Sequence, residues 1–295
     1  YERVRAAFLD LMAGFPERGM PAPEPTANHG PWAGEAARWL EARDDLSLVA
    51  GITRGQIARL RESGVETFTA LGSRDPGRVR GIGDEVRGRL HRQAALQLRS
   101  RGKASPEYLL LPTPPDNPGQ GLAALPPASP ADVYFDMEGY PAADDWLEYL
   151  FGAVTVDAGE PVFRDWWAHD PKQERQAFEA FIDWVVARWR MDPGLHVYHY
   201  AAYEPNALKR LMTKYGTRED EVDALLRAGV FIDLFNVVRR GVMVGEPAYS
   251  LKNVEHLYRP ARAGEVTDAG ASVAVYDEWC ESGQGQDWRT SSLLK

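Results

Sequence analysis

The spacing of apolar residues changes near residue 131 and divides the chain into a helical part and a mixed part. Between residues 45 and 103 apolar residues recur at helical spacing and glycines interrupt the pattern, which predicts several short helices. Two more helices are predicted within residues 1–20 and over residues 32–43. The stretch 104–130 contains eight prolines and is therefore predicted to be a stiff linker.

After residue 131 strand-like and helix-like patterns alternate up to about residue 282, and the polar tail from Gly283 is expected to fray. The first three strands form an antiparallel meander, and helices then alternate with shorter strands. This order, β-β-β-α-β-α-β-α, predicts an α/β fold with a mixed sheet flanked by helices. The predicted strands are 132–139, 147–156, 161–167, 195–200 and 230–234, and the predicted helices are 170–189, 203–215, 250–257 and 271–280.

Charge is spread unevenly between these parts. The whole chain of 295 residues carries a formal charge of -9, yet residues 51–103 hold 12 basic and 5 acidic residues, a net of +7. The rest of the chain therefore has a net charge of -16. A basic segment beside an acidic domain suggests a polyanionic partner for the first and metal chemistry in the second. A solvated, arginine-rich helix face explains the same charge equally well.

Composition narrows the classes of protein. No apolar run approaches the ~20 residues that cross a bilayer, and no signal-peptide core is found, so we expect a cytoplasmic protein without a membrane partner. The single cysteine, Cys280, excludes an internal disulfide framework and a cysteine-rich metal site. The chain begins with Tyr1 and not with methionine, which suggests a piece of a longer protein.

Two Gly-Ile segments, at 51–52 and 81–83, lie between the helices of the basic segment. Gly81 and Gly83 flank one aliphatic residue and permit a tight turn whose free N–H groups begin the next helix. Such a helix end suits a phosphate, and Arg80 and Arg87 lie close to it in sequence. The segment resembles a helix-hairpin-helix unit, which grips nucleic-acid backbones. An ordinary helix cap in a structural spacer is the alternative.

Paired carboxylates mark the first strand of the mixed part. Alternate residues of a strand share a face, so Asp136 and Glu138 project to one side, while Phe135 and Met137 project to the other. Two adjacent carboxylates repel each other, and a divalent cation between them relieves the repulsion. Hard oxygen ligands suit Mg²⁺ or Mn²⁺. A solvent-facing edge strand explains the pair as well.

The element order is that of ribonuclease-H-like domains, and the motifs resemble the DEDD exonuclease superfamily, relatives of the DnaQ proofreading subunit. Asp136-Met137-Glu138 matches the first motif of that family. His199-Tyr200-Ala201-Ala202-Tyr203-Glu204 is similar to the second, with Glu204 where the family usually has aspartate. In the last motif Asp277 matches the fourth carboxylate, but Ser272 stands at the histidine position. Phe231-Ile232-Asp233-Leu234 resembles a strand whose aspartate is usually structural.

The sequences of several segments resemble one subgroup most closely, the RecB-like nucleases. The segments Tyr134–Gly139, Leu147–Gly152 and Val197–Glu204 carry this resemblance. That family joins a RecB-type nuclease, a helix-hairpin-helix and a ribonuclease-H-like domain, often ahead of a helicase in the same full-length chain. The resemblance implies four parts: 1–44, the end of a RecB-type nuclease region; 45–103, the helix-hairpin-helix domain; 104–130, the linker; and 131–295, the exonuclease domain.

The resemblance implies a 3′–5′ exonuclease that hydrolyses DNA, as a single strand or at a 3′ end, by a two-metal mechanism with Mg²⁺ or Mn²⁺. Asp136, Glu138, Glu204 and Asp277 would be the ligands, with Tyr276 or His199 as the candidate general base. Arg80, Gly81, Gly83 and Arg87 would contact DNA. The alternative is a non-catalytic nucleic-acid-binding adaptor with a degenerate exonuclease fold, which Glu204 and Ser272 favour. Sequence does not separate DNA from RNA as the substrate.

Overall fold

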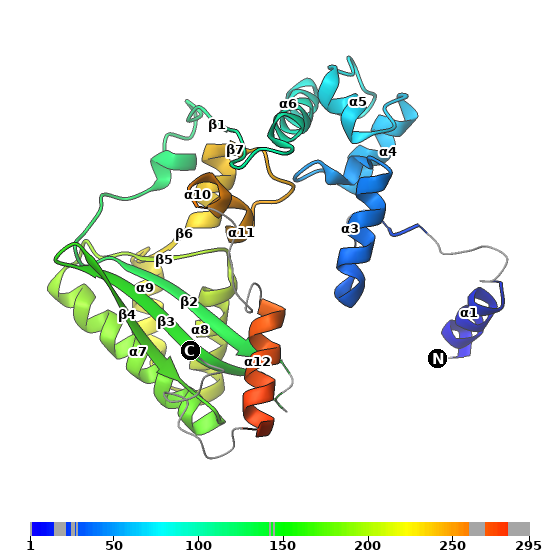
Figure 1. Cartoon of the computed structure of the whole chain (residues 1–295). Helices are drawn as coiled ribbons and strands as arrows, with labels where there is room; N and C mark the ends of the chain where they lie inside the picture. The colour runs from blue at the N-terminus through cyan, green and yellow to red at the C-terminus, as the bar shows by residue number, and fades with distance from the viewer. Residues whose placement is uncertain are drawn as a thin grey trace. The chain divides into compact units, whose positions relative to one another are not determined.

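The computed structural model describes residues 2–14, 22–24, 27, 29–141, 143, 145–259 and 269–282. The predicted polar tail from Gly283 lies outside the described residues. The chain divides into two compact units (Figure 1). A helical unit comprises Tyr1–Glu107 with Val244–Ala248, and a sheet unit comprises Tyr108–Met243 with Tyr249–Lys295.

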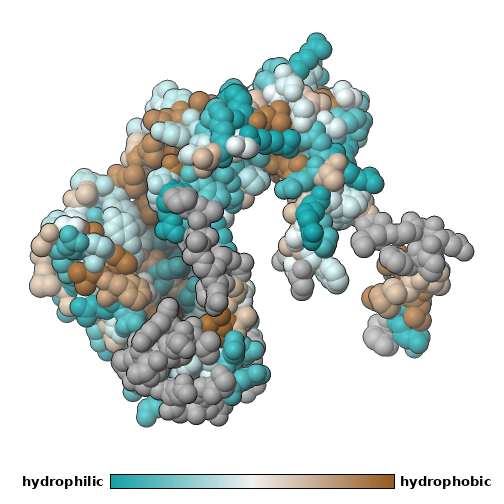
Figure 2. Space-filling view, viewed as in Figure 1, coloured by the Kyte–Doolittle hydropathy of each residue, from teal (hydrophilic) through white to brown (hydrophobic). Residues whose placement is uncertain are grey.

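Short helices around a small apolar core build the helical unit. Leu46, Leu60, Phe68 and Leu71 are fully buried in that core, whereas α1 has no buried residue. Helix α4 begins at a capping box in which Thr53 and Gln56 satisfy each other's backbone N–H groups. Hydrophilic residues cover much of the visible surface of this unit (Figure 2). The elements are α1 (Glu2–Ala13), η1 (Gly30–Trp32), α3 (Ala33–Ala42), η2 (Leu46–Leu48), α4 (Arg54–Glu62), α5 (Phe68–Ser73) and α6 (Asp84–Ser100).

The sheet unit contains the predicted mixed sheet. Its strand order is β4-β3-β2-β5-β6, with β2, β3 and β4 antiparallel and with β5 and β6 parallel to β2. The predicted α/β class and the meander followed by parallel crossovers are therefore confirmed. The strands are β2 (Val133–Tyr140), β3 (Leu147–Asp157), β4 (Glu160–Trp167), β5 (Val197–His199) and β6 (Phe231–Asp233).

Helices α7 (Pro171–Met191), α8 (Tyr203–Tyr215) and α9 (Glu219–Arg227) share one apolar core with the sheet. The Phe135 ring stacks on Phe181 of α7, with 4.0 Å between ring centroids. Helix α12 (Ala269–Ser282) packs at the start of β3, where Tyr276 and Trp279 bury Leu147 and Tyr149 (Figure 1). No described helix is long and apolar enough to cross a membrane.

Several short elements lie outside the predicted pattern. Within the predicted linker, β1 (Tyr108–Leu110) pairs with β7 (Val242–Val244) in a separate two-stranded sheet, and η3 (Gly121–Ala124) follows. Helices α9 and α10 (Leu234–Gly241) were not predicted. Each of these helices buries only two residues, so their apolar pattern is too short to identify. The predicted helix 250–257 consists of α11 (Leu251–Val254) and η4 (Glu255–Leu257).

Candidate active site and nucleic-acid interface

The acidic pair lies on one face of β2. Phe135 and Met137 are buried in the core, while Asp136 is exposed and Glu138 is half-buried. The backbone register places Asp136 opposite Gly152 of β3, so a position without a side chain lies beside the exposed carboxylate. The period-2 geometry of a strand thus brings the two carboxyl groups to the same side.

The environment of Glu138 favours its protonated form. Burial is the largest cause, and the nearby charges of Asp136 and Glu148 add to it, so that the pKa of Glu138 is raised to about 7. Lys252 of α11 acts in the opposite direction. A neighbouring carboxylate raises the proton affinity of a carboxyl group. A cation bound between the two would offset this repulsion and restore the charged form.

Glu204 lies in the first turn of α8 with only 3% of its surface exposed. Its Oε2 atom has no hydrogen-bond partner among the described residues and lies 3.4 Å from Nδ1 of His199. That nitrogen is also 2.6 Å from the carbonyl oxygen of Ala201, which can only accept, so Nδ1 of His199 carries a proton. His199 is buried in β5, and this contact gives it a role in the turn before Glu204.

Asp233 holds the same turn from β6. Ala201 has a left-handed φ of 73°, which is unusual for a residue with a side chain, and its N–H donates to Oδ1 of Asp233 over 2.9 Å. The same oxygen accepts from the N–H of Phe235 over 2.9 Å and caps α10. Asp233 thereby fixes the approach of the chain to Glu204, a structural role that the resemblance implied.

The last motif lies on α12, and its two candidate residues differ sharply. The Tyr140 hydroxyl at the end of β2 donates a hydrogen bond to Asp277, which raises the pKa of Tyr140 to about 12. Tyr276 is 1% exposed and stacks on Tyr149, with 3.9 Å between ring centroids. Its hydroxyl lies 3.0 Å from Nδ1 of His169. Burial raises the pKa of Tyr276, and its position fits packing; the general-base role stays a prediction.

The structure brings the sequence-predicted ligands together only in part. Asp136 and Glu138 are neighbours, Asp277 is tied to the last residue of their strand, and Glu204 lies one turn after β5. Within the described part of the chain no group of three or more His, Cys, Asp or Glu side chains is placed to hold a metal ion. The chemical nature of the donors nevertheless suits a hard divalent cation, since all four are carboxylates and Glu204 has a buried oxygen without a partner.

A fifth carboxylate, Glu148 of β3, was not predicted as a site residue. It is fully buried and accepts hydrogen bonds from Tyr203, Trp146 and Arg210. The sequence gives one signal for it, a glutamate inside the apolar first half of a strand. Two of its three partners, Tyr203 and Arg210, lie 55 and 62 residues away, so pattern alone does not reveal them.

The helical unit contains two turns of the same form. In each, a glycine with positive φ is the third residue, and the N–H of the fourth donates to the carbonyl of the first, as in a type II turn. One turn is Val49–Ile52 before α4, with 3.1 Å between N and O, and the other is Val79–Ile82 before α6, with 3.2 Å. This repetition matches the two Gly-Ile segments of the sequence. Helix α4 has a side-chain cap, whereas Gly83 leaves the start of α6 without one.

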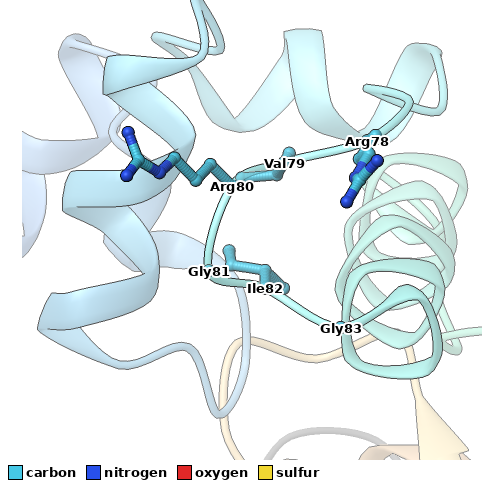
Figure 3. A pocket seen from close by; sticks show the side chains of 6 residues that line it. All are labelled: Arg78, Val79, Arg80, Gly81, Ile82 and Gly83. Carbon is cyan, nitrogen blue, oxygen red and sulfur yellow. The ribbon is translucent and has the colours of Figure 1, made fainter.

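A hollow of about 600 Å³ follows the second turn and is lined by residues 78–83 (Figure 3). Arg78 and Arg80 point to opposite sides of it and are exposed. Arg87 instead forms an ion pair with Asp75 and is largely buried. Arg59 of α4, which was not predicted, donates to the carbonyl oxygen of Gly81 over 2.6 Å and holds the turn.

Comparison with known proteins gives one match. The model of the RNase H superfamily matches residues 133–293, just over half of the chain and all five strands of the mixed sheet. No curated protein and no solved structure matches the chain.

Proposed function

The chain belongs to the RNase H superfamily, and on that premise we propose that its sheet unit is a divalent-metal-dependent 3′–5′ exonuclease acting on DNA. Domains of this superfamily generally hydrolyse nucleic acids, so a nuclease-type activity follows from the family. The observation that carries the proposal is the acidic pair on β2, whose two carboxylates share one face of the strand; burial and the charge of Asp136 raise the pKa of Glu138 to about 7.

Asp136 and Glu138 would hold Mg²⁺ or Mn²⁺, with Glu204 and Asp277 completing the ligand set. When bound, the ions supply a nucleophilic water and stabilise the leaving 3′ oxygen. Asp233 and His199 hold the turn that precedes Glu204, and Tyr140 orients Asp277. The role of the protein residues is therefore to present carboxylates in fixed orientations. Tyr276 and His199, both buried, remain the two candidates for the general base.

A second function is favoured by a specific observation: no described group of three carboxylates or histidines is placed to hold a metal. The chain would then be a nucleic-acid-binding adaptor with a degenerate exonuclease fold, a reading that Glu204 in place of aspartate also supports. The two functions make opposite predictions for cleavage in the presence of Mn²⁺.

The test is a 5′-labelled single strand of DNA incubated with Mn²⁺ or with EDTA. The proposal predicts a ladder that shortens from the 3′ end, that needs Mn²⁺, and that disappears in Asp136→Ala. Asp157→Asn, an exposed change at the β3–β4 turn, is the matched control and should cleave like the wild type. An intact strand under every metal condition would support the adaptor. A labelled RNA strand in parallel decides between the two substrates.

The turn before α6 would hold the DNA backbone through the N–H groups of Gly81 and Gly83 and the side chain of Arg80. Because Arg87 is paired with Asp75, Arg80 is expected to carry more of the contact. Asp84 and Glu85 follow the turn directly and would weaken the attraction for phosphate.

Arg80→Glu should weaken DNA binding and reduce the slope of log K against log salt by about 1, because one phosphate contact is lost. Arg38→Glu on α3 makes the same charge change away from the turn and serves as the control. Equal effects of the two variants would remove the turn from the interface and leave only nonspecific electrostatic attraction.

A further inference from the structure

Glu148 is a fully buried carboxylate on a strand that is otherwise apolar at this end. It accepts hydrogen bonds from the Tyr203 hydroxyl over 2.8 Å, from Nε1 of Trp146 over 3.1 Å, and from the guanidinium of Arg210. Burying a charged group is unfavourable unless it is paired and fully hydrogen-bonded, and a buried ion pair rarely stabilises a fold more than apolar packing would. A stabilising role therefore explains little of why a carboxylate lies here.

The position of Glu148 is more informative than its burial. In the register of β2 and β3, Glu148 lies opposite Gly139, the residue directly after Glu138. Its partner Tyr203 is the first residue of α8, directly before Glu204. Glu148 thus contacts both Gly139, which follows Glu138, and Tyr203, which precedes Glu204. The two proposed metal ligands are far apart in the chain.

The packing around Gly139 shows how close this junction is. A Cβ atom at Gly139 would lie 2.4 Å from the Tyr203 hydroxyl, 2.8 Å from Oε2 of Glu148 and 2.8 Å from Nε1 of Trp146. Polar atoms of the cluster therefore rest directly on the backbone of β2, and only glycine admits them. Arg210 lies seven residues after Tyr203, two turns along α8, so the carboxylate holds the helix at two points on one face.

We propose that Glu148 is a positioning residue that fixes the start of α8 against the end of β2 and so sets Glu204 relative to Glu138. This inference rests on the proposed metal-dependent function. Three donors already take most of the acceptor sites of Glu148, which favours a positioning role over direct contact with the ion. Loss of the cluster would weaken metal binding, since residues that orient metal ligands typically contribute 10–100-fold in affinity.

The same helix supplies a matched control. At the far end of α8, the Tyr215 hydroxyl donates to Glu174 of α7, another fully buried carboxylate, which also pairs with Lys214 over 3.0 Å. Tyr203→Phe and Tyr215→Phe thus remove the same chemical group and the same kind of hydrogen bond, twelve residues apart. Only the first donates to the Glu148 side chain and lies beside a proposed ligand; Glu174 touches Glu148 through the backbone, accepting from the Glu148 N–H.

The experiment measures Mn²⁺ binding to the full chain by the electron paramagnetic resonance signal of the free ion, alongside thermal melting. Tyr203→Phe should raise the Mn²⁺ dissociation constant about tenfold, whereas Tyr215→Phe should leave it unchanged although both lose one hydrogen bond. Cleavage by Tyr203→Phe should recover at higher Mn²⁺, because positioning affects occupancy more than the step itself. Arg210→Met removes a second donor to Glu148 and should raise the Mn²⁺ dissociation constant as Tyr203→Phe does. This agreement supports the inference even if Tyr203→Phe melts earlier than Tyr215→Phe.

The possible outcomes distinguish a failure of the positioning role of Glu148 from a failure of the proposed metal-dependent function. If the wild type binds Mn²⁺ and cleaves DNA, and both tyrosine variants bind Mn²⁺ as tightly as the wild type does, Glu148 is only a structural residue. Equal loss of affinity in both variants refutes the inference as well, because general destabilisation then explains it. If the wild type neither binds Mn²⁺ nor cleaves, the proposed function itself fails and the positioning role falls with it.

Discussion

Replacing Gly139 by alanine tests the packing on which the site depends. The added Cβ would lie 2.4 Å from the Tyr203 hydroxyl and 2.8 Å from both Oε2 of Glu148 and Nε1 of Trp146, so at least one hydrogen bond of the cluster must open. Overpacking of a tight interior costs about 1–3 kcal/mol, and a lost hydrogen bond to a charged group costs about 1.5–3 kcal/mol. Opening the hydrogen bond relieves part of the overpacking, so the two costs do not add in full, and we expect a loss of roughly 2–4 kcal/mol in the free energy of unfolding.

For a unit of this size each kcal/mol lowers the melting temperature by about 2–4 °C, so Gly139→Ala should melt roughly 4–16 °C below the wild type. Tryptophan fluorescence follows this transition, because most tryptophans lie in the sheet unit. Gly152→Ala on the neighbouring strand is the control, since its Cβ would meet the exposed Phe163 ring at 3.3 Å and the backbone oxygen of Asp136 at an ordinary contact distance of 3.8 Å. If Gly139→Ala melts no earlier than Gly152→Ala, the described packing of the cluster is wrong.

Three further predictions concern other parts of the chain. Tyr276→Phe should lose about 0.5–1.5 kcal/mol of stability through its buried hydroxyl and retain cleavage, and abolished cleavage in a folded variant would support the general-base role. Asp183→Asn should lower the free energy of unfolding by at most about 1 kcal/mol near pH 7. Because the hydrogen bond from Arg218 lowers the pKa of Asp183, the difference between variant and wild type should vanish as the pH falls through that lowered pKa. A difference in stability that persisted in acid would contradict the pairing. Arg59→Ala should loosen the turn and expose the Ile82 amide, which donates to Val79, to faster hydrogen exchange measured by mass spectrometry, and unchanged exchange would show that Arg59 does not hold the turn.

Local patterns predicted the sheet well because strand geometry is local. Alternation along Val133–Tyr140 is enough to place Asp136 and Glu138 on one face, and the Asp157–Glu160 turn joins β3 and β4 as expected. Short helices were not predicted because two buried residues, as in α9, do not define a helical repeat of apolar positions. The helical pattern of α12 was predicted, but its orientation was not. Tyr276 and Asp277 are one residue apart, and a rotation of about 100° buries the first and leaves the second accessible.

The tertiary part of the site could not be predicted from patterns. Glu148 draws two of its three side-chain donors, Tyr203 and Arg210, from 55 and 62 positions away in the chain, and nothing near it in sequence reveals those two. The role of Arg59 at the turn before α6 depends on a contact across 22 residues. Such contacts are decided by how helices pack and not by local spacing. The resemblance to DEDD enzymes supplied the candidate positions Glu204 and Asp277, which residue patterns alone do not single out.

The central claim is that the acidic pair on β2 holds a divalent cation, and an anomalous-difference map from crystals soaked in Mn²⁺ tests it most directly. The account predicts a peak between the carboxylates of Asp136 and Glu138, with Glu204 or Asp277 as a further ligand. The peak should be lost in Asp136→Asn crystals grown under the same conditions. Wild-type crystals with ordered carboxylates and no peak at this pair in millimolar Mn²⁺ would contradict the claim.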